Sequence, residues 1–265
     1  MYSLWLVCEP EEVDILSAEL CEADTIGIQE IDEDGRVALA AGFKTNEHRA
    51  SLLKQFAAYT PRWMAENAVD WEAISRAAWS PREIGNRFVV VPHWHVAPKI
   101  SGRLPLVHNP GLACGTGEHP CTQLGLIALE KFVSVGSVLV DVGTGSGLLA
   151  IAALRLGAAR SIGLDIDCAS LAAARENFRL NELIDELVCG SADCLADACS
   201  DVVIANISGT VLLAIWEELL RITRRPGYLI VTGFPESELR IFQQLLPEAY
   251  VFELEEWRCL AAKLS

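Results

Sequence analysis

The chain has 265 residues, 51% of them hydrophobic, and a formal net charge of −15. This length is sufficient for a large domain and a small one. The excess of acidic residues argues against tight binding to a nucleic-acid backbone, which needs clustered Lys and Arg, and no uncharged apolar window is long enough for a membrane span.

The nine cysteines are odd in number, irregularly spaced and include no C-x-x-C pair. A secreted disulfide framework is therefore not expected. The N-terminal stretch MYSLWLVCEPEEVDIL also lacks the basic region and cleavage site of a signal peptide. Together these features predict a cytoplasmic protein with reduced cysteines.

The first 69 residues are expected to form a small α+β domain. Apolar alternation predicts strands, and helical spacing of apolar residues predicts helices between them. The predicted strands are 2–8, 25–32, 36–43 and 62–71, and the predicted helices are 10–23 and 46–59. The resulting order, βαββαβ, is typical of a ferredoxin-like domain. We assign the Trp- and Pro-rich residues 70–95 as a linker.

The remaining residues, 96–265, are expected to form a larger domain in which strands and helices alternate. The predicted strands are 137–143, 161–166, 186–190, 201–207 and 228–234, with a closing hairpin in 250–264. The predicted helices are 147–158, 168–181, 209–224 and 236–246. Such alternation predicts an α/β fold with a doubly wound, mostly parallel sheet of seven strands.

The stretch VLVDVGTGSGLLAIAA predicts a strand, a glycine loop and a helix. Gly143, Gly145 and Gly147 follow a G-x-G-x-G pattern, whereas a nicotinamide fingerprint would need its third glycine where Leu148 stands. Asp141 precedes the loop, and its negative charge disfavours a pyrophosphate. It suits a cationic cofactor with a free amino group.

S-adenosylmethionine is such a cofactor. Asp165 ends the next predicted strand, where a carboxylate can accept hydrogen bonds from both ribose hydroxyls. Asp193 lies near the end of the third strand and is predicted to reach the adenine amino group. A nicotinamide site and an ordinary strand-to-helix turn are the alternatives for this loop.

Four motifs occur in the order and spacing of the bacterial ribosomal protein methyltransferase family PrmA. They are GTGEHPCT, VLVDVGTGSGLLAIAALRLGA, IGLDID and DVVIANI. The stretches VDWEAI and FVVVPHW are similar to the linker of that family. The βαββαβ start is similar to its substrate-recognition domain. The resemblance implies a class I methyltransferase fold for residues 96–265.

The resemblance also implies roles for individual residues. Thr122 and Gly143 would contact the cofactor, Asp165 would hold the ribose, and Asn206 would lie beside the reacting groups. The chain departs from the family pattern in three places near the expected acceptor channel. Cys114 replaces an aromatic residue, Cys121 replaces a threonine, and Ser208-Gly209 replaces the usual leucine and alanine.

The stretch LACGTGEHPCT, residues 112–122, admits several interpretations. A metal site would use Cys114, His119 and Cys121, but structural zinc needs four ligands, and we predict no metal site. A phosphate loop would need a following Gly-Lys-Ser/Thr. We interpret the stretch as a flexible loop that folds over the methionine end of the cofactor, with a plain surface loop as the alternative.

The activity that the resemblance implies is methyl transfer to lysine and N-terminal amines of a large-subunit ribosomal protein. Asn206 is predicted to orient the amine, and His119 is either a general base or a residue that fixes the loop. The expected partner is this basic protein, without direct nucleic-acid or membrane recognition, and the enzyme is expected to be a monomer. The alternatives are methylation of another protein or a small amine, a non-catalytic cofactor-binding partner protein, and a nicotinamide-dependent oxidoreductase.

Overall fold

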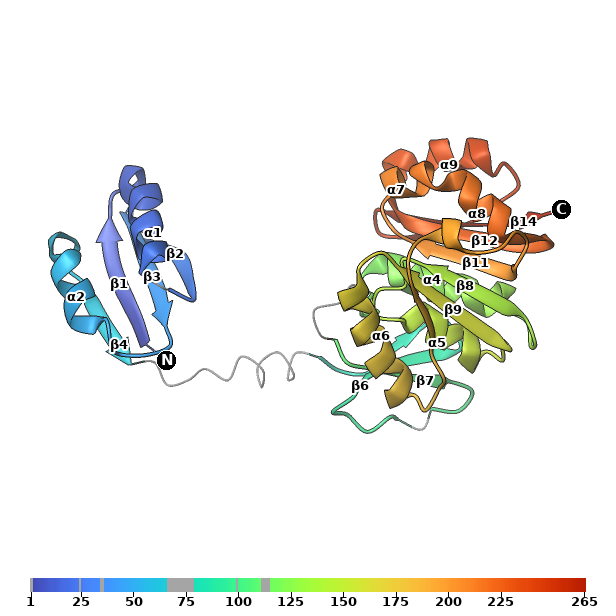
Figure 1. Cartoon of the computed structure of the whole chain (residues 1–265), viewed down its shortest axis with the longest axis horizontal. Coiled ribbons are helices and arrows are strands. Elements are labelled where there is room, and N and C mark those ends of the chain that lie inside the picture. Colours follow the sequence, from blue (N-terminus) through green and yellow to red (C-terminus); the bar gives the residue numbers. More distant parts are fainter. Residues whose placement is uncertain (1, 24, 34–35, 66–78, 99, 111–114) are drawn as a thin grey trace. The chain divides into compact units, whose positions relative to one another are not determined.

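The computed structural model describes residues 2–23, 25–33, 36–65, 79–98, 100–110 and 115–265. It divides the chain into two compact units, Met1–Arg76 and Ala77–Ser265 (Figure 1). Each unit is described by itself below. None of the helices in these residues has the length and apolar character needed to span a membrane.

The first unit has the expected βαββαβ order. Its elements are β1 (Tyr2–Cys8), α1 (Val13–Glu22), β2 (Gly27–Glu33), β3 (Arg36–Phe43), α2 (Arg49–Gln55) and β4 (Arg62–Ala65). The strands form an antiparallel sheet in the order β2-β3-β1-β4. The predicted strand 62–71 is thus observed as far as Ala65, and its remaining residues lie outside the described part of the chain.

The core of the first unit follows from two periodicities. Leu4 and Leu6 alternate along β1 and face the same side of the sheet, where both are fully buried. Leu16 and Leu20 are one helical turn apart on α1 and join the same cluster, as does Phe56 after α2. Both helices therefore share one core with the sheet.

The second unit contains a seven-stranded sheet in the order β10-β9-β8-β11-β12-β14-β13. Its strands are β8 (Val138–Val142), β9 (Arg160–Asp165), β10 (Glu186–Cys189), β11 (Ser200–Asn206), β12 (Thr223–Pro235), β13 (Tyr250–Leu254) and β14 (Trp257–Leu264). The pairs from β10 to β12 are parallel, and only β14 runs antiparallel to both of its neighbours. The predicted doubly wound, mostly parallel sheet is confirmed.

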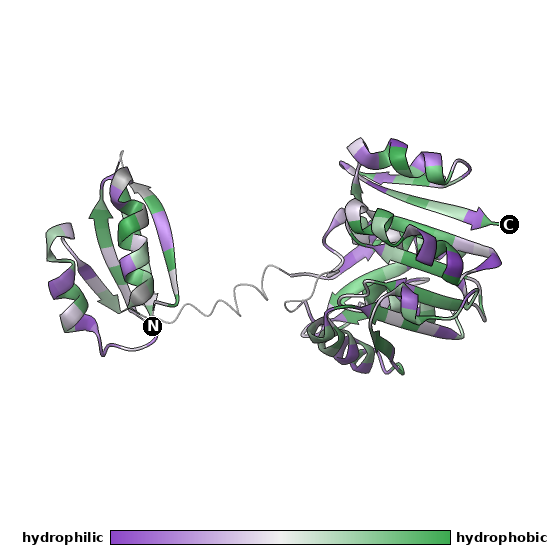
Figure 2. Ribbon diagram, turned by 45° about the horizontal axis from the view of Figure 1, so that its top comes forward, coloured by the Kyte–Doolittle hydropathy of each residue, from purple (hydrophilic) through white to green (hydrophobic). Residues whose placement is uncertain are grey.

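Helices cover both faces of this sheet (Figure 1). They are α4 (Pro120–Phe132), α5 (Leu148–Arg155), α6 (Cys168–Leu180), α7 (Gly209–Ala214), α8 (Trp216–Ile222) and α9 (Leu239–Leu245). One core holds side chains of α4, α5 and α6, and the other holds those of α7, α8 and α9. The central strands are therefore mostly apolar, as Figure 2 shows. Asp141 on β8 is a buried exception.

Two helical predictions differ from the structure. The predicted helix 209–224 is two helices, because the backbone at Ile215 (φ −111°, ψ 18°) leaves the helical region between α7 and α8. Helix α4 was not predicted. It begins because His119 caps its N-terminus and Pro120 occupies its first turn, where a missing N–H costs nothing. Thr122, predicted to lie in a loop, is therefore on this helix.

Part of the predicted linker belongs to the second unit. A three-stranded sheet is formed by β5 (Arg82–Ile84), β6 (Phe88–Pro92) and β7 (Leu104–His108), and the first two strands lie within residues 70–95. All five residues of β6 are buried, and Phe88 and Val90 belong to the α4–α6 core. This burial is why residues 79–95 are a structural layer rather than a linker.

Two buried asparagines, Asn177 on α6 and Asn181 at the C-cap of that helix, connect this small sheet to the rest of the unit. The side chain of Asn181 accepts a hydrogen bond from Val107 N (2.9 Å) and donates to Val107 O (2.6 Å), so it continues the backbone ladder beyond β7. Asn177 accepts from Asn109 N (2.8 Å) and donates to Ser146 O (2.8 Å). Helix α6 thereby joins β7 to the glycine loop.

The cysteines also differ from expectation. Cys168 and Cys189 form a disulfide, with their Cα atoms 5.5 Å apart, so the prediction of reduced cysteines is wrong for this pair. The pair is hidden in the sequence because 21 positions separate its members. They meet because Cys189 ends a strand next to β9, and Cys168 begins the helix that follows β9.

We predict that Asn181→Ala lowers the free energy of unfolding by about 2–4 kcal/mol, because it leaves both backbone groups of Val107 unpaired beneath α6. Urea denaturation of the full chain measures this change. Asn86→Ala is the matched control, since Asn86 is exposed and its side chain makes no hydrogen bond within the described residues. Equal stability of the two variants would contradict the prediction.

Candidate functional site

A cleft lies at the carboxyl ends of β8 and β11, where the strand order changes direction. In open α/β sheets, such a switch point is where ligands bind. The cleft contains about 320 Å³ of unfilled space, including its open mouth. It is lined by Gly115, Thr122, Gly143, Thr144, Gly145, Ser146, Leu148, Leu149 and Asn206. Three predicted motifs thus meet in one place.

The glycine loop has a backbone that side chains would disrupt. Gly143, Gly145 and Gly147 all have positive φ angles, of 74°, 52° and 79°. A Cβ on Gly143 would also collide with the side chain of Ile207, and one on Gly147 would lie 3.2 Å from Ala174. Close packing and unusual dihedral angles therefore both require glycine here.

Asp165 fixes the shape of this loop. One carboxylate oxygen accepts a hydrogen bond from Gly145 N (2.9 Å), and the other accepts from Asp167 N (3.0 Å). Asp167 in turn caps α6 by accepting from Ala169 N (2.9 Å). The half-buried carboxylate thus lies between the glycine loop and the start of α6, at the end of β9, where the sequence predicted it.

Asp141 is fully buried and does not line the cleft. Its carboxyl accepts a hydrogen bond from the hydroxyl of Thr144 (2.7 Å), which does line the cleft. Burial raises the pKa of Asp141 to about 7, against the opposing effect of the Thr144 hydrogen bond. The structure therefore places Asp141 beneath the loop, where it acts on the cleft through Thr144.

Asn206 and Thr122 come from distant parts of the chain and meet at the cleft. Asn206 ends β11, and its Nδ2 donates to the hydroxyl of Thr122 on α4 (3.2 Å). No described group donates to Asn206 Oδ1, so this oxygen is available as an acceptor. Asp193 lies in a short 3-10 helix after β10, is exposed, and does not line the cleft.

His119 lies at the N-cap of α4 rather than in the wall of the cleft. Its Nδ1 accepts a hydrogen bond from Cys121 N (3.2 Å), and its ring packs edge-on against Trp257 with centroids 4.6 Å apart. His119 therefore caps α4 and packs against β14. Within the described residues, which exclude Cys114, no group of three or more His, Cys, Asp or Glu is arranged to hold a metal ion.

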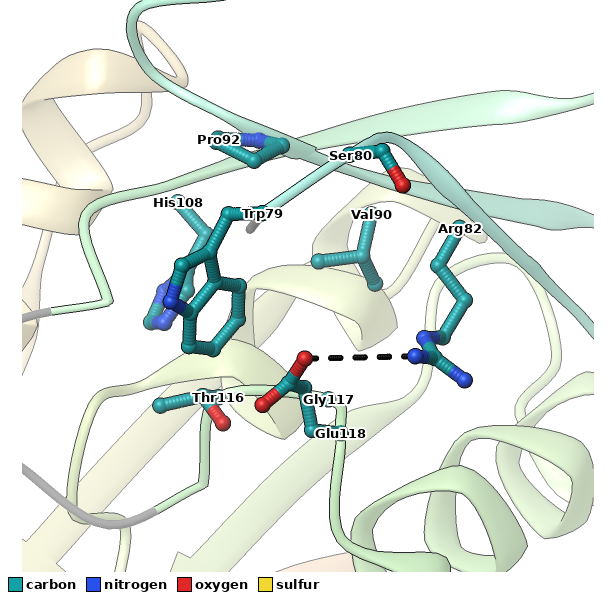
Figure 3. Close-up of a pocket in the computed structure, with 9 residues that line it drawn as sticks. All are labelled: Trp79, Ser80, Arg82, Val90, Pro92, His108, Thr116, Gly117 and Glu118. Carbon is teal, nitrogen blue, oxygen red and sulfur yellow. Dashed lines mark ion pairs between the residues drawn. The ribbon is translucent and has the colours of Figure 1, made fainter. Parts of the chain in front are cut away.

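A second pocket lies on the other side of the loop 115–117, which is distinct from the glycine loop 143–147, and sequence reasoning did not find this pocket. Figure 3 shows Trp79 and His108 on one side of this pocket and the Arg82–Glu118 ion pair (3.9 Å) on the other. Thr116 also lines it, whereas Gly115 of the same loop lines the cleft. The loop is therefore a shared wall between two cavities.

His108 is the unusual group in this second pocket. It is 1% exposed, and neither ring nitrogen has a hydrogen-bond partner among the described residues. Burial lowers its pKa to about 4, with a smaller contribution from repulsion by His93. The imidazole is therefore neutral at pH 7.

The family model and the curated relatives agree on one family. The family model described as "Ribosomal protein L11 methyltransferase (PrmA)" matches residues 9–264. A curated relative with that name from Symbiobacterium thermophilum is 34% identical over 190 residues, which are 72% of this chain and 62% of the relative. Another from Anoxybacillus flavithermus is 35% identical over 205 residues, 74% of this chain and 66% of the relative.

A solved structure is also similar. The ribosomal protein L11 methylase from Lactobacillus delbrueckii subsp. bulgaricus superposes with a TM-score of 0.65 and 30% sequence identity, covering 71% of this chain and all of that one. The chain spans slightly less than two thirds of the length of the two curated relatives.

We predict that His108 makes stability depend on pH between about 6.5 and 4. In this range the unfolded chain binds a proton at His108 and the folded chain does not. The contribution of His108 to the free energy of unfolding is therefore fully present above pH 6.5 and is lost as the pH falls toward 4. The total loss from this group is about 3 kcal/mol. His108→Leu is expected to remove that part of the pH dependence in urea denaturation.

The control for this prediction is His48→Leu, since His48 is exposed. The free energy of unfolding of this variant should change with pH as that of the wild type does. A pH dependence of His108→Leu that equals the wild type would show that the imidazole does not remain neutral.

Proposed function

Because the chain belongs to the ribosomal protein L11 methyltransferase (PrmA) family, we propose that it transfers methyl groups from S-adenosylmethionine to amines of large-subunit ribosomal protein L11. The observation that carries this proposal is the meeting of Asn206, Thr122 and the glycine loop in one cleft. Lysine and N-terminal amines are the proposed acceptors, and the cytoplasm is the proposed location.

Residues that line the cleft, together with Asp165 and Asp193 beyond its lining, fit this cofactor. Gly143 and Gly145 contribute only backbone to the lining of the cleft, so a ligand can approach the loop closely. The carboxylate of Asp165 suits the ribose hydroxyls, and the Asn206 and Thr122 side chains suit the polar methionine end. Asp193 is the proposed partner of the adenine amino group. When bound, S-adenosylmethionine supplies an electrophilic methyl group on a sulfonium.

The work of the protein is to place a neutral amine in line with that methyl group. A free lysine has a pKa of about 10.4, and removal from water disfavours its charged form. Asn206 Oδ1 accepts a hydrogen bond from the amine and so directs the lone pair of the amine nitrogen toward the methyl group. The hydrogen bond to Thr122 fixes the amide in the required orientation. His119, as the cap of α4, positions Thr122.

Charge and domain organisation agree with a basic protein substrate. The net charge of −15 favours encounter with a basic protein and disfavours nucleic acid. The first unit, with its ferredoxin-like sheet, is the proposed substrate-recognition domain. We propose that the enzyme acts as a monomer.

Intact-mass spectrometry tests the function. The full chain is incubated with S-adenosylmethionine and unmethylated L11, and successive methyl-sized mass increases on L11 are expected. Peptide mapping then identifies the modified amines. If L11 gains no mass while calorimetry detects cofactor binding, the substrate assignment is wrong and the cofactor assignment remains.

We predict that Asn206→Ala lowers the single-turnover rate of methyl transfer about 100-fold, because the amine loses its orienting acceptor. Rapid-quench measurement with saturating L11 gives this rate. Asn86→Ala should react like the wild type. A rate for Asn206→Ala within threefold of the wild type would exclude the orienting role.

We predict that Gly143→Ala weakens S-adenosylmethionine binding at least tenfold, because the new methyl group collides with Ile207 and distorts the loop. Gly136→Ala is a matched control: Gly136 also has a positive φ (85°), but a Cβ there meets nothing within 4 Å, and it does not line the cleft. Isothermal titration calorimetry compares the two. Equal affinities would show that the close approach to Ile207 is not required.

A further inference from the structure

The disulfide between Cys168 and Cys189 lies beside the residues proposed to hold the adenosine of the cofactor. Cys189 ends β10 and is the register partner of Asp165 on β9. Gly190 N, the next amide, donates to Asp165 O (2.9 Å). Cys168 begins α6, directly after Asp167. The bond therefore joins the two backbone segments that flank Asp165.

The disulfide is accessible from solvent, since Cys168 and Cys189 are both exposed. Exposed disulfides are the ones that exchange readily with thiols, whereas structural disulfides resist reduction. In cytoplasmic proteins, disulfides are typically transient and catalytic or redox-sensing. The exposed position of the Cys168–Cys189 disulfide thus differs from that of a disulfide buried in a core.

A third cysteine lies in the segment that follows β10. Cys194 is exposed and free, and its Sγ donates to Ser191 O (2.9 Å). A Cβ on Gly190, the residue after Cys189, would lie only 3.3 Å from this sulfur. Asp193, the proposed adenine contact, directly precedes Cys194. The segment from Cys189 to Cys194 thus holds one cysteine of the disulfide and one free thiol.

We propose that Cys168 and Cys189 form a thiol–disulfide exchange site that controls the affinity of the adenosine side of the cleft. Its reaction partners are small thiols and disulfides of the glutathione class. The proposal rests on the proposed function, because it assigns a regulatory input to the proposed cofactor site.

The exchange reaction balances in two steps. A reduced thiol attacks the Cys168–Cys189 disulfide as thiolate, forms a mixed disulfide with one cysteine and releases the other as a thiol. A second thiol molecule then attacks the mixed disulfide, which frees the remaining cysteine and leaves the two small thiols as a disulfide. The protein gains two electrons and two protons, and the reverse reaction uses a small-molecule disulfide as oxidant.

The physical effect is preorganisation. In the oxidised chain, the β9–α6 segment and the segment after β10 are covalently joined, so less conformational freedom is lost when a ligand binds between them. In the reduced chain, the hydrogen bond from Gly190 to Asp165 still holds the backbone. The change in affinity is therefore moderate, and we expect the reduced enzyme to bind S-adenosylmethionine three- to tenfold more weakly.

The test uses the full chain equilibrated in a series of glutathione redox buffers. Differential alkylation with peptide mass mapping measures the fraction of the Cys168–Cys189 pair that is oxidised. Calorimetry measures the affinity for S-adenosylmethionine at both ends of the series. We expect the pair to open as the buffer becomes reducing and the affinity to fall with it.

Variants make the result specific. Cys168→Ser should bind the cofactor with the reduced affinity in every buffer, whereas Cys21→Ser, which changes an exposed cysteine of the first unit, should respond like the wild type. A pair that never opens or never forms, or affinities that agree within twofold in all states, would overturn the proposal. Absence of cofactor binding in every state and variant would instead refute the proposed function on which it rests.

Discussion

The carboxylate of Asp165 is the constraint on which the cleft depends. It accepts hydrogen bonds from Gly145 in the glycine loop and from Asp167 at the start of α6. The next turns of α6 act on the same loop, because Asn177 binds the carbonyl of Ser146. One strand end and one helix therefore set the shape of a loop that precedes them in the chain.

Sequence reasoning succeeded where the signal is local. The alternation of strands and helices predicted the doubly wound sheet. The positions of Gly143, Gly145 and Asp165 in the fold could be predicted because a strand, a glycine loop and an acid at the next strand end form a short pattern. Asn206 and Thr122 were assigned from the family resemblance. Their hydrogen bond joins residues from α4 and β11, and no local pattern contains both.

Features that depend on distant packing were missed. Strand β6 is short and apolar, and its pairing with β5 and β7 and the packing of Phe88 and Val90 in the α4–α6 core distinguish it from a linker. Asn177 looks like any polar residue of a surface helix, although it is completely buried. The sequence placed Asp141 correctly at the end of its strand, but its orientation toward Thr144 depends on the three-dimensional path of the loop.

The small sheet of β5, β6 and β7 also determines where the chain can be cut or fused between its two units. Its middle strand contributes Phe88 and Val90 to the α4–α6 core, and its last strand is bound by Asn181, so the sheet is an inseparable layer of the second unit. The junction at which a first unit from a relative can be exchanged therefore lies before β5, near residue 77, and not at residue 95. A chain cut at residue 95 would leave an apolar helix surface in water, and aggregation rather than loss of recognition would dominate its behaviour.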